Sequence, residues 1–557
     1  MSERSGAFSN RLLRGRGLRA GFVGLFLGLL CVSYGNVDAF NIPTGNDDLV
    51  LRWDNTFRYT LQSRVADQED ALLRNANGDD GDRNFEDGIV SNRIDVLSEA
   101  DLVYKQAWGV RASGAFWYDQ AYSGHFDNDS VATSNYLENG VQDTGIYNQA
   151  ERYFEGPSGE LLDCFAFGRI DVGNTSHFIK VGRHTYYWGE ALLNPIHSIS
   201  YGQMPLDLAK ATAQPGVEVK EVFRPRNSVS VVSQLSPDFQ LAAQYFLEWE
   251  EDMLPEAGTY FSSSDLSVVG RGAMIMGPGV FFQHGDDIEP DDRGDFGISA
   301  KWSPSFMDGT FGFYYRNFSD VLPQAVINLA DATYHYEYAD DIDMFGISYA
   351  TEIFGLSLGA DFNYRRNMPL NSEAAVVADA SYLPKDGETL GARGETLHCL
   401  INLLGTLKRT PIWEAGSWNV EFGYSRWLEV DEGKEYFKGR SAYNGFDEVT
   451  RDNGLIAGNF SPQWLQVLPG VDLSLPLTAS YGLWGVSSVA NGGAKKDGSW
   501  GVGLALDIYT KYKVNLNYVN YFGEIERDPA TGVATARGGN GLLRDRDFVS
   551  LTLKTSF

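Results

Sequence analysis

VSLTLKTSF (549–557) ends the chain and alternates strictly between two kinds of side chain. Its odd-numbered positions hold Val, Leu, Leu, Thr and Phe, and its even-numbered positions hold Ser, Thr, Lys and Ser. A period of two residues is the period of a β-strand, whose successive side chains point to opposite faces. The stretch therefore predicts a strand with one apolar and one polar face.

A final strand that ends on an aromatic residue is similar to the C-terminal sorting signal of bacterial outer-membrane barrels. The other end of the chain agrees with this interpretation. An arginine-rich start precedes an apolar run at 20–34, which is long enough for a signal-peptide core and short for a spanning helix. Val37-Asp38-Ala39 offers a cleavage site. We expect a signal peptide over 1–39, cleaved near Ala39, and an outer-membrane chain over 40–557.

The charge balance excludes one class of partner. The chain has 45 basic and 74 acidic residues, a formal net charge of −29. Nucleic-acid binding requires a basic face, so we expect no nucleic-acid partner. Acidic surface loops could instead meet divalent cations or basic solutes.

The same alternation recurs along the chain in pairs of segments joined by short turns, and long polar loops separate the pairs. The predicted strands are 49–64, 91–105, 108–122, 161–172, 176–187, 226–235, 239–249, 294–303, 309–318, 342–351, 355–367, 394–408, 417–429, 460–468, 471–484, 498–509, 512–524 and 545–557. Strands of this length suit a membrane, where a sheet must close on itself to satisfy its backbone. The fold class expected is an all-β transmembrane antiparallel β-barrel of about 16–18 strands, with short turns in the periplasm and long loops outside.

The polar faces of the early strands predict a charged lumen wall. Candidate wall residues are Arg52, Asp54, Arg58, Arg93, Asp95, Glu99 and Arg111. Both signs occur on neighbouring strands, which fits a polar channel whose field orients solutes. It fits equally well a set of pairs that neutralise one another and brace the wall.

The segment 182–226 is richer in Trp, His and aliphatic residues than an external loop requires. We expect it to fold back into the barrel. The candidate constriction residues are His184, Trp188, Glu190, His197, Asp207, Lys210, Glu218 and Arg224. The alternative is an inert plug that fills space.

Several stretches of the chain closely resemble the proteobacterial domain-of-unknown-function 1302 family. They include Leu51-Arg52-Trp53-Asp54, Tyr187-Trp188-Gly189-Glu190 and Pro205-Leu206-Asp207-Leu208-Ala209-Lys210. The resemblance covers nearly the whole mature chain. It implies an outer-membrane barrel in envelope transport, accompanied by a periplasmic lipid-carrier-like protein and an inner-membrane exporter of the resistance-nodulation-division type. It implies no catalytic residues.

Two loops have acidic clusters with the oxygen ligands that calcium prefers. Asn75, Asn77, Asp79 and Asp82 place such oxygens close together, although their spacing departs from the EF-hand pattern. The alternative is a solvated loop. We therefore expect no resident cofactor, apart from a candidate Ca²⁺ in these external loops.

Two common enzyme motifs are missing from the sequence. It contains no His-Glu-x-x-His and no phosphate-binding Gly-Lys-Ser/Thr. We therefore expect a channel or conduit for envelope transport, of hydrophobic solutes or lipids, and not an enzyme. The alternatives are a non-conducting docking component of an export complex and, more remotely, an outer-membrane hydrolase.

Overall fold

The computed structural model describes residues 40–124, 126–214, 217, 219–266 and 272–557. The predicted signal peptide over 1–39 and the candidate constriction residue Glu218 lie outside the described residues. No helix among the described residues is long and apolar enough to cross a lipid bilayer.

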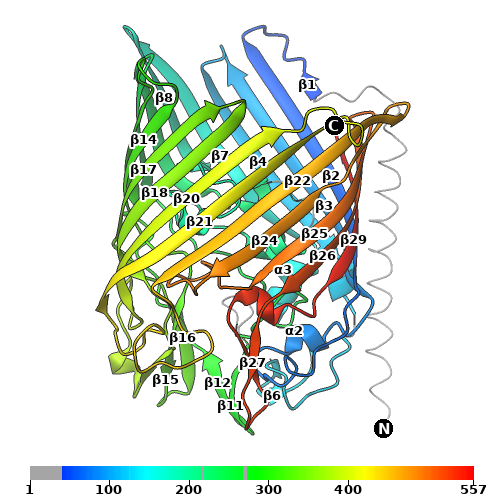
Figure 1. Ribbon diagram of the computed structural model, residues 1–557, viewed down its shortest axis with the longest axis vertical. Helices are drawn as coiled ribbons and strands as arrows, with labels where there is room; N and C mark the ends of the chain where they lie inside the picture. The colour runs from blue at the N-terminus through cyan, green and yellow to red at the C-terminus, as the bar shows by residue number, and fades with distance from the viewer. Residues whose placement is uncertain (1–39, 125, 215–216, 218, 267–271) are drawn as a thin grey trace.

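One antiparallel sheet forms a closed barrel of eighteen strands within the described chain, as predicted (Figure 1). In order around the barrel the strands are β2 (Leu49–Arg64), β3 (Ile89–Tyr104), β4 (Trp108–Asp119), β7 (Ser158–Val172), β8 (Thr175–His184), β9 (Arg226–Ser236), β10 (Phe239–Phe246), β13 (Phe296–Trp302), β14 (Thr310–Phe318), β17 (Ile342–Ile353), β18 (Leu356–Pro369), β20 (Arg393–Thr406), β21 (Ala415–Glu432), β22 (Asp452–Leu468), β23 (Val471–Ser474) continued by β24 (Leu477–Trp484), β25 (Gly498–Ile508), β26 (Tyr512–Phe522) and β29 (Phe548–Ser556).

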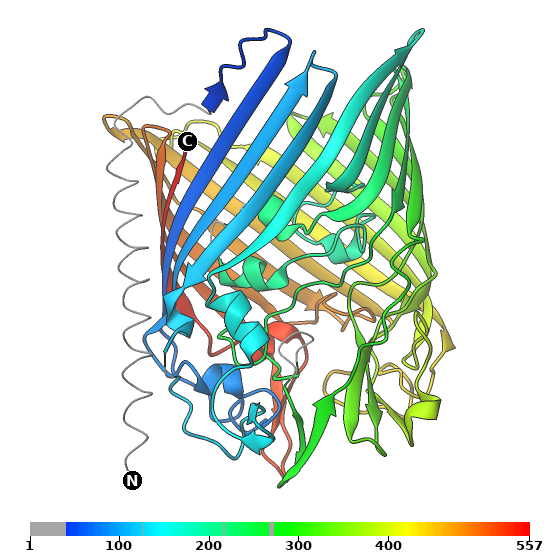
Figure 2. The same cartoon turned by 180° about the vertical axis from the view of Figure 1, so that it is seen from behind.

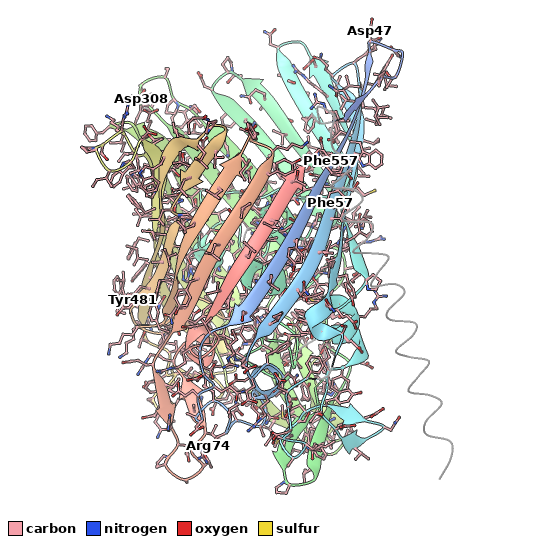
Figure 3. The ribbon with its side chains drawn as sticks, turned by 90° about the vertical axis from the view of Figure 1, so that its right-hand side faces the viewer. Asp47, Phe57, Arg74, Asp308, Tyr481 and Phe557 are labelled. Atoms are coloured by element: carbon pink, nitrogen blue, oxygen red, sulfur yellow. The ribbon has the colours of Figure 1, made fainter. Side chains whose placement is uncertain are left out.

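The first and last strands close the barrel. β2 pairs with β29 from Thr56↔Ser556 to Arg64↔Phe548. Across this seam the rings of Phe57 and Phe557 stack with centroids 5.3 Å apart (Figure 3). The terminal aromatic residue therefore packs against the first barrel strand. The short β1 (Phe40–Ile42) pairs with the start of β2 on the same edge that β29 occupies further along the strand.

Two of the predicted strands differ most from the structure. β22 begins at Asp452, well before the predicted start, because the glycines of its first half obscure the alternation. The strand predicted at 471–484 is one barrel position broken between β23 and β24, where Pro476 cannot donate a hydrogen bond to a neighbour.

The barrel is apolar outside and polar inside. In the second half of β2 the buried residues are Arg58, Thr60, Gln62 and Arg64. In contrast, large apolar side chains on the opposite faces of the strands are exposed, as at Phe116 (54 %) and Ile298 (55 %). This is the reverse of a water-soluble protein, which buries its apolar side chains and exposes its charged ones.

The long connections gather at one end of the barrel, the lower end in Figure 1. They contain a five-stranded sheet and two hairpins. The sheet comprises β11 (Met274–Gly277), β12 (Val280–His284), β16 (Thr333–Glu337), β15 (Gln324–Asn328) and β19 (Ala375–Val377), and the hairpins are β5 (Leu137–Glu138) with β6 (Val141–Gln142) and β27 (Ile525–Arg527) with β28 (Ala534–Ala536). The short helices of these connections are α2 (Asp80–Arg83), η1 (Gln120–Tyr122), α3 (Asn148–Phe154), η3 (Ala380–Tyr382) and η4 (Gly539–Leu542).

Candidate functional site

The chain between β8 and β9 leaves the wall and runs through the lumen, as predicted. We call the described residues of 185–225 the inward segment. It contains η2 (Pro195–His197), α4 (Leu208–Ala213) and α5 (Val219–Val222). Figure 2 shows these short helices within the ring of strands. An irregular backbone at this depth needs protein partners for its N–H and C=O groups.

Inward-facing carboxylates accept the N–H groups of the first part of the inward segment. Glu421 on β21 accepts hydrogen bonds from the backbone N–H groups of Leu192, Leu193 and Asn194 at 2.6, 3.0 and 2.6 Å. Asp361 on β18 accepts one from the N–H of Glu190 at 3.0 Å. Hydrogen bonds to a charged acceptor are stronger than neutral ones, so these carboxylates hold the segment against one wall.

Two buried arginines of the same wall bind the carbonyl groups. Arg365 donates to the carbonyl oxygens of Ile196 and Ser198 at 2.8 and 3.0 Å. Arg316 donates to those of Ile199 and Tyr201 at 2.9 and 2.6 Å. Each guanidinium also stacks on an aromatic ring, Tyr201 for Arg365 and Phe318 for Arg316, both at 4.4 Å.

Ion pairs hold the second part of the inward segment to the opposite wall. Arg58 on β2 pairs with Glu221 at 3.1 Å and donates to Gln214 at 2.7 Å. Lys220 pairs with Glu99 on β3, and Lys210 pairs with Glu160 on β7. The segment thus spans the lumen from β18–β21 to β2–β7.

The candidate constriction residues divide between the two walls. His184 lies at the end of β8, with Nε2 2.7 Å from Oγ of Ser230, and Trp188 is buried against Tyr314. The ring of His197 stacks on that of His398 on β20, and its Nε2 donates to the carbonyl of Gly492 at 2.9 Å.

The remaining candidates of the inward segment bear charges. The carboxylate of Glu190 accepts from Ser348, and Arg224 pairs with Glu250 at 3.1 Å. Asp207 caps α4 through the N–H of Lys210 at 2.7 Å and forms an ion pair with its side chain at 3.1 Å. The described candidates are all buried or half-buried, and their role in setting what passes stays a prediction.

The predicted wall residues face the lumen, and most are paired. Arg93 pairs with Asp95 at 2.9 Å, and Arg111 pairs with Glu99, with Asp101 at 2.9 Å and with Asp163 at 3.1 Å. Arg52 is exposed and Asp54 half-buried at the other end of β2 from the long loops. These charges are therefore paired in the half of the wall that contacts the inward segment, and their bracing role stays a prediction.

Several anchoring residues were missed by the sequence reasoning. Glu421, Arg316 and Asn402 were not among the candidates, yet all three bind the inward segment directly. Their position on the polar face of a predicted strand was the available signal. It did not distinguish them from other lumen residues.

The wall is interrupted next to the inward segment. β7 pairs with β4 from Ser158, but with β8 only from Cys164↔Arg183 onward. The half of β7 at 158–163 therefore has a strand neighbour on one side only. The Nε of Arg183 donates to the carbonyl of Leu161 at 3.3 Å, where a strand would otherwise pair.

Two cavities flank this half of β7. One, of about 440 Å³, lies between β7 and the start of β9 and is lined by Cys164, Arg183 and Glu248 among others. The other, of about 1040 Å³, lies over β3, β4 and β7, and its lining is mostly apolar, with Ile94 and Phe116. Glu160 and Leu161 line both cavities.

The candidate calcium residues have different surroundings. Asp82 pairs with Arg64 at 2.7 Å, and Asn75 and Asn77 form hydrogen bonds within the loops. Asp79 instead lies beside Asp80 and Asp265. The two described cysteines, Cys164 and Cys399, are not joined by a disulfide.

A family model described as a protein of unknown function, DUF1302, matches residues 20–557. The chain belongs to the DUF1302 family. A comparison with curated proteins finds no match for this DUF1302 chain.

Solved structures show a distant similarity to this DUF1302 chain. OccK2 (OpdF) of Pseudomonas aeruginosa, solved in complex with glucuronate, is 11% identical with a TM-score of 0.38, over 91% of this chain and 97% of that one. A BenF-like porin from Pseudomonas fluorescens Pf-5 is 10% identical with a TM-score of 0.39, over 91% and 98%. Pseudomonas aeruginosa OccD3 (OpdP) is 11% identical with a TM-score of 0.40, over 94% of each chain.

Proposed function

We propose that this protein is an outer-membrane β-barrel that conducts apolar or amphiphilic molecules between the lumen and the lipid. The closed sheet and its apolar outer face support the membrane location. The pairing of the first and last strands closes the sheet, and exposed residues such as Phe116 and Ile298 gain by contact with lipid.

The inward segment sets the route through the lumen. It is held at both walls by buried ion pairs and charge-assisted hydrogen bonds, so it acts as a fixed constriction. A constriction lined by charges of both signs orients the polar solutes that pass through it.

The observation that carries the proposal is the half-paired β7 between two cavities. Because 158–163 lacks a second strand neighbour, this part of the wall can yield at a lower cost than a fully paired strand. The larger cavity presents apolar side chains outward, whereas Glu160 beside it reaches Lys210 of the inward segment. An amphiphile could keep its polar group at these charges while its apolar part enters the lipid.

A thiol-labelling experiment tests the lateral route. Cys164 is exposed and lines the smaller cavity, so a pyrene maleimide attached there would fill the gap. In a Cys399→Ser background, we expect the labelled protein in liposomes to pass the apolar dye N-phenylnaphthylamine several-fold more slowly than the unlabelled protein. The ionic conductance of the same sample reports whether the lumen is unchanged.

A matched control carries the label elsewhere on the outer face. Ile298 on β13 is as exposed to the outside as Leu161 but is far along the barrel from β7. Ile298→Cys, in a background with serine at both native positions, should pass the dye at the same rate with and without the label. Equal dye transfer by labelled and unlabelled Cys164 protein would refute the lateral route.

A further inference from the structure

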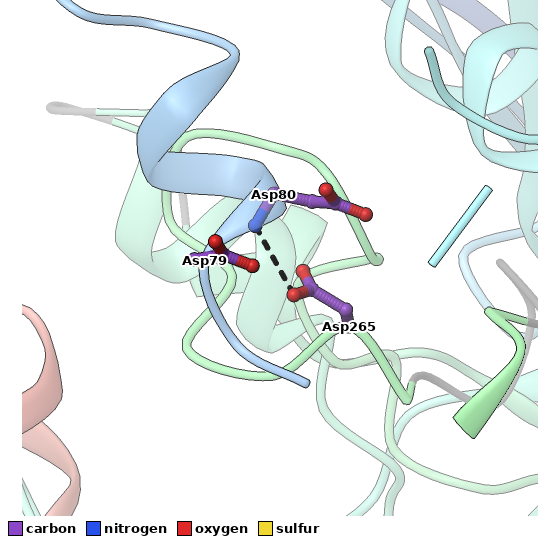
Figure 4. Close-up of side chains that lie close together, drawn as sticks. All are labelled: Asp79, Asp80 and Asp265. Carbon is purple, nitrogen blue, oxygen red and sulfur yellow. Dashed lines mark hydrogen bonds between the residues drawn. The ribbon is translucent and has the colours of Figure 1, made fainter. Parts of the chain in front are cut away.

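Three buried aspartates meet among the long connections, outside the barrel. Asp79 and Asp80 lie at the start of α2, between β2 and β3, and Asp265 comes from the connection between β10 and β11 (Figure 4). Their side chains are 0, 3 and 1 % exposed. One oxygen of each lies within 4.8 Å of the others. Buried carboxylates this close together repel one another strongly unless a cation or a proton lies among them.

The hydrogen bonds around the three carboxylates leave two oxygens without a partner. Asp80 accepts from the N–H of Asn135 at 2.8 Å, Asp265 accepts from the N–H of Asp80 at 3.1 Å, and Asp79 pairs with Arg83 at 2.5 Å. Oδ1 of Asp79 and Oδ1 of Asp265 are buried and have no hydrogen-bond partner. Figure 4 shows these two carboxylates turned toward one another.

A neutral oxygen is available at the same place. Asn135, whose backbone N–H binds Asp80, uses its side-chain nitrogen to bind Asn77 and the carbonyl of Ala273. Its Oδ1 is buried and without a hydrogen-bond partner. Carboxylate oxygens together with an amide oxygen form a ligand set that Ca²⁺ prefers.

The surrounding charges do not neutralise the cluster. Asp82 and Asp545, which lie next to it, share Arg64 and Arg546, with Asp82 at 2.7 Å from Arg64 and 3.2 Å from Arg546. With Arg83 on Asp79, this described network holds five buried carboxylates and three arginines; the carboxylates are Asp79, Asp80, Asp82, Asp265 and Asp545. With all five carboxylates ionised the network has an excess of two negative charges, which one divalent cation would balance.

We propose that Asp79, Asp80 and Asp265 bind one Ca²⁺, with Asn135 as a further oxygen ligand. The ion joins the connection after β2 to the connections after β4 and β10, because its ligands come from all three. Burial and the charge of Asp79 raise the pKa of Asp265 to about 7, which agrees with the close approach of these carboxylates. The site lies among the connections, so it is independent of the proposed transport route.

Terbium luminescence on the full chain in detergent tests the proposal. After chelator treatment and dialysis, we expect Tb³⁺ to bind with one saturable site and Ca²⁺ to displace it. Asp265→Asn should weaken binding at least tenfold, and Asp79→Asn should do the same by removing a different ligand. Asp308→Asn is the matched control, since Asp308 is an exposed turn aspartate at the other end of the barrel and its loss changes the net charge equally (Figure 3).

The folded state of each variant is checked by its heat-modifiable mobility on gels, as for other barrels. The absence of a saturable Tb³⁺ or Ca²⁺ site in wild-type protein would overturn the proposal and point to a shared proton instead. Equal weakening by Asp308→Asn would show a general effect of net charge and would also overturn it. Displacement of Tb³⁺ by Mg²⁺ in preference to Ca²⁺ would overturn the assignment of calcium.

Discussion

Replacing Glu421 by Gln should release the first part of the inward segment while leaving the barrel closed. The carboxylate is fully buried and accepts the N–H groups of Leu192, Leu193 and Asn194. Glutamine keeps one oxygen for Leu193 and Asn194 but places an NH₂ group against the N–H of Leu192. The substitution keeps the size of the side chain, so it leaves no cavity that would add to the loss of stability.

The expected cost follows from these bonds. One buried donor left without an acceptor costs about 1–3 kcal/mol, and two charge-assisted bonds that become neutral lose roughly 1 kcal/mol together. The sum is about 3 kcal/mol of local stability, which corresponds to roughly 100-fold faster amide exchange where exchange follows the opening equilibrium.

Hydrogen exchange with mass spectrometry measures this directly in detergent. Peptides that cover 190–200 should lose protection by about that factor, whereas peptides from β22 should not change. Glu352→Gln, at an exposed position on β17, is the matched control. If protection at 190–200 is the same in Glu421→Gln and wild type, the carboxylate does not hold the segment and the reasoning fails.

Three further changes follow from the same contacts. Arg58→Met removes the buried ion pair with Glu221, which should cost about 3–5 kcal/mol and raise single-channel conductance; an unchanged conductance in planar bilayers contradicts the anchoring role. Phe557→Ala removes the stack on Phe57 at the seam, so thermal unfolding of the barrel should begin at lower temperature by circular dichroism, with no shift counting against a sealing role. Arg183→Gln removes the hydrogen bond to the carbonyl of Leu161 on the half-paired β7 and should speed dye transfer in liposomes. Slower transfer would contradict the lateral route.

Much of the barrel could be predicted from the sequence because the strand period is short and local. Each strand must expose apolar residues to one environment and polar residues to another, so the alternation is written in consecutive residues, as at 549–557. The alternation was weakest at the start of β22, where glycines replace apolar residues, and at Pro476.

The candidate site was predicted less completely. The unusual composition of 182–226 indicated an inward course, but its partners come from strands far along the chain. Glu421 lies 228 residues from Leu193 in the sequence, and no local pattern links them. The partners implied by the family resemblance, a periplasmic carrier and an exporter, stay predictions.

The sequence by itself determined the two-faced strands, their order and the presence of one segment too apolar for an external loop, because these depend on side chains close together in the chain. Only the tertiary structure decided which carboxylates and arginines hold that segment, where β7 lacks a neighbour, and that Asp265 meets Asp79 and Asp80. Closing the sheet brings distant residues within hydrogen-bond range, and such pairs depend on register and curvature, which no stretch of sequence encodes alone.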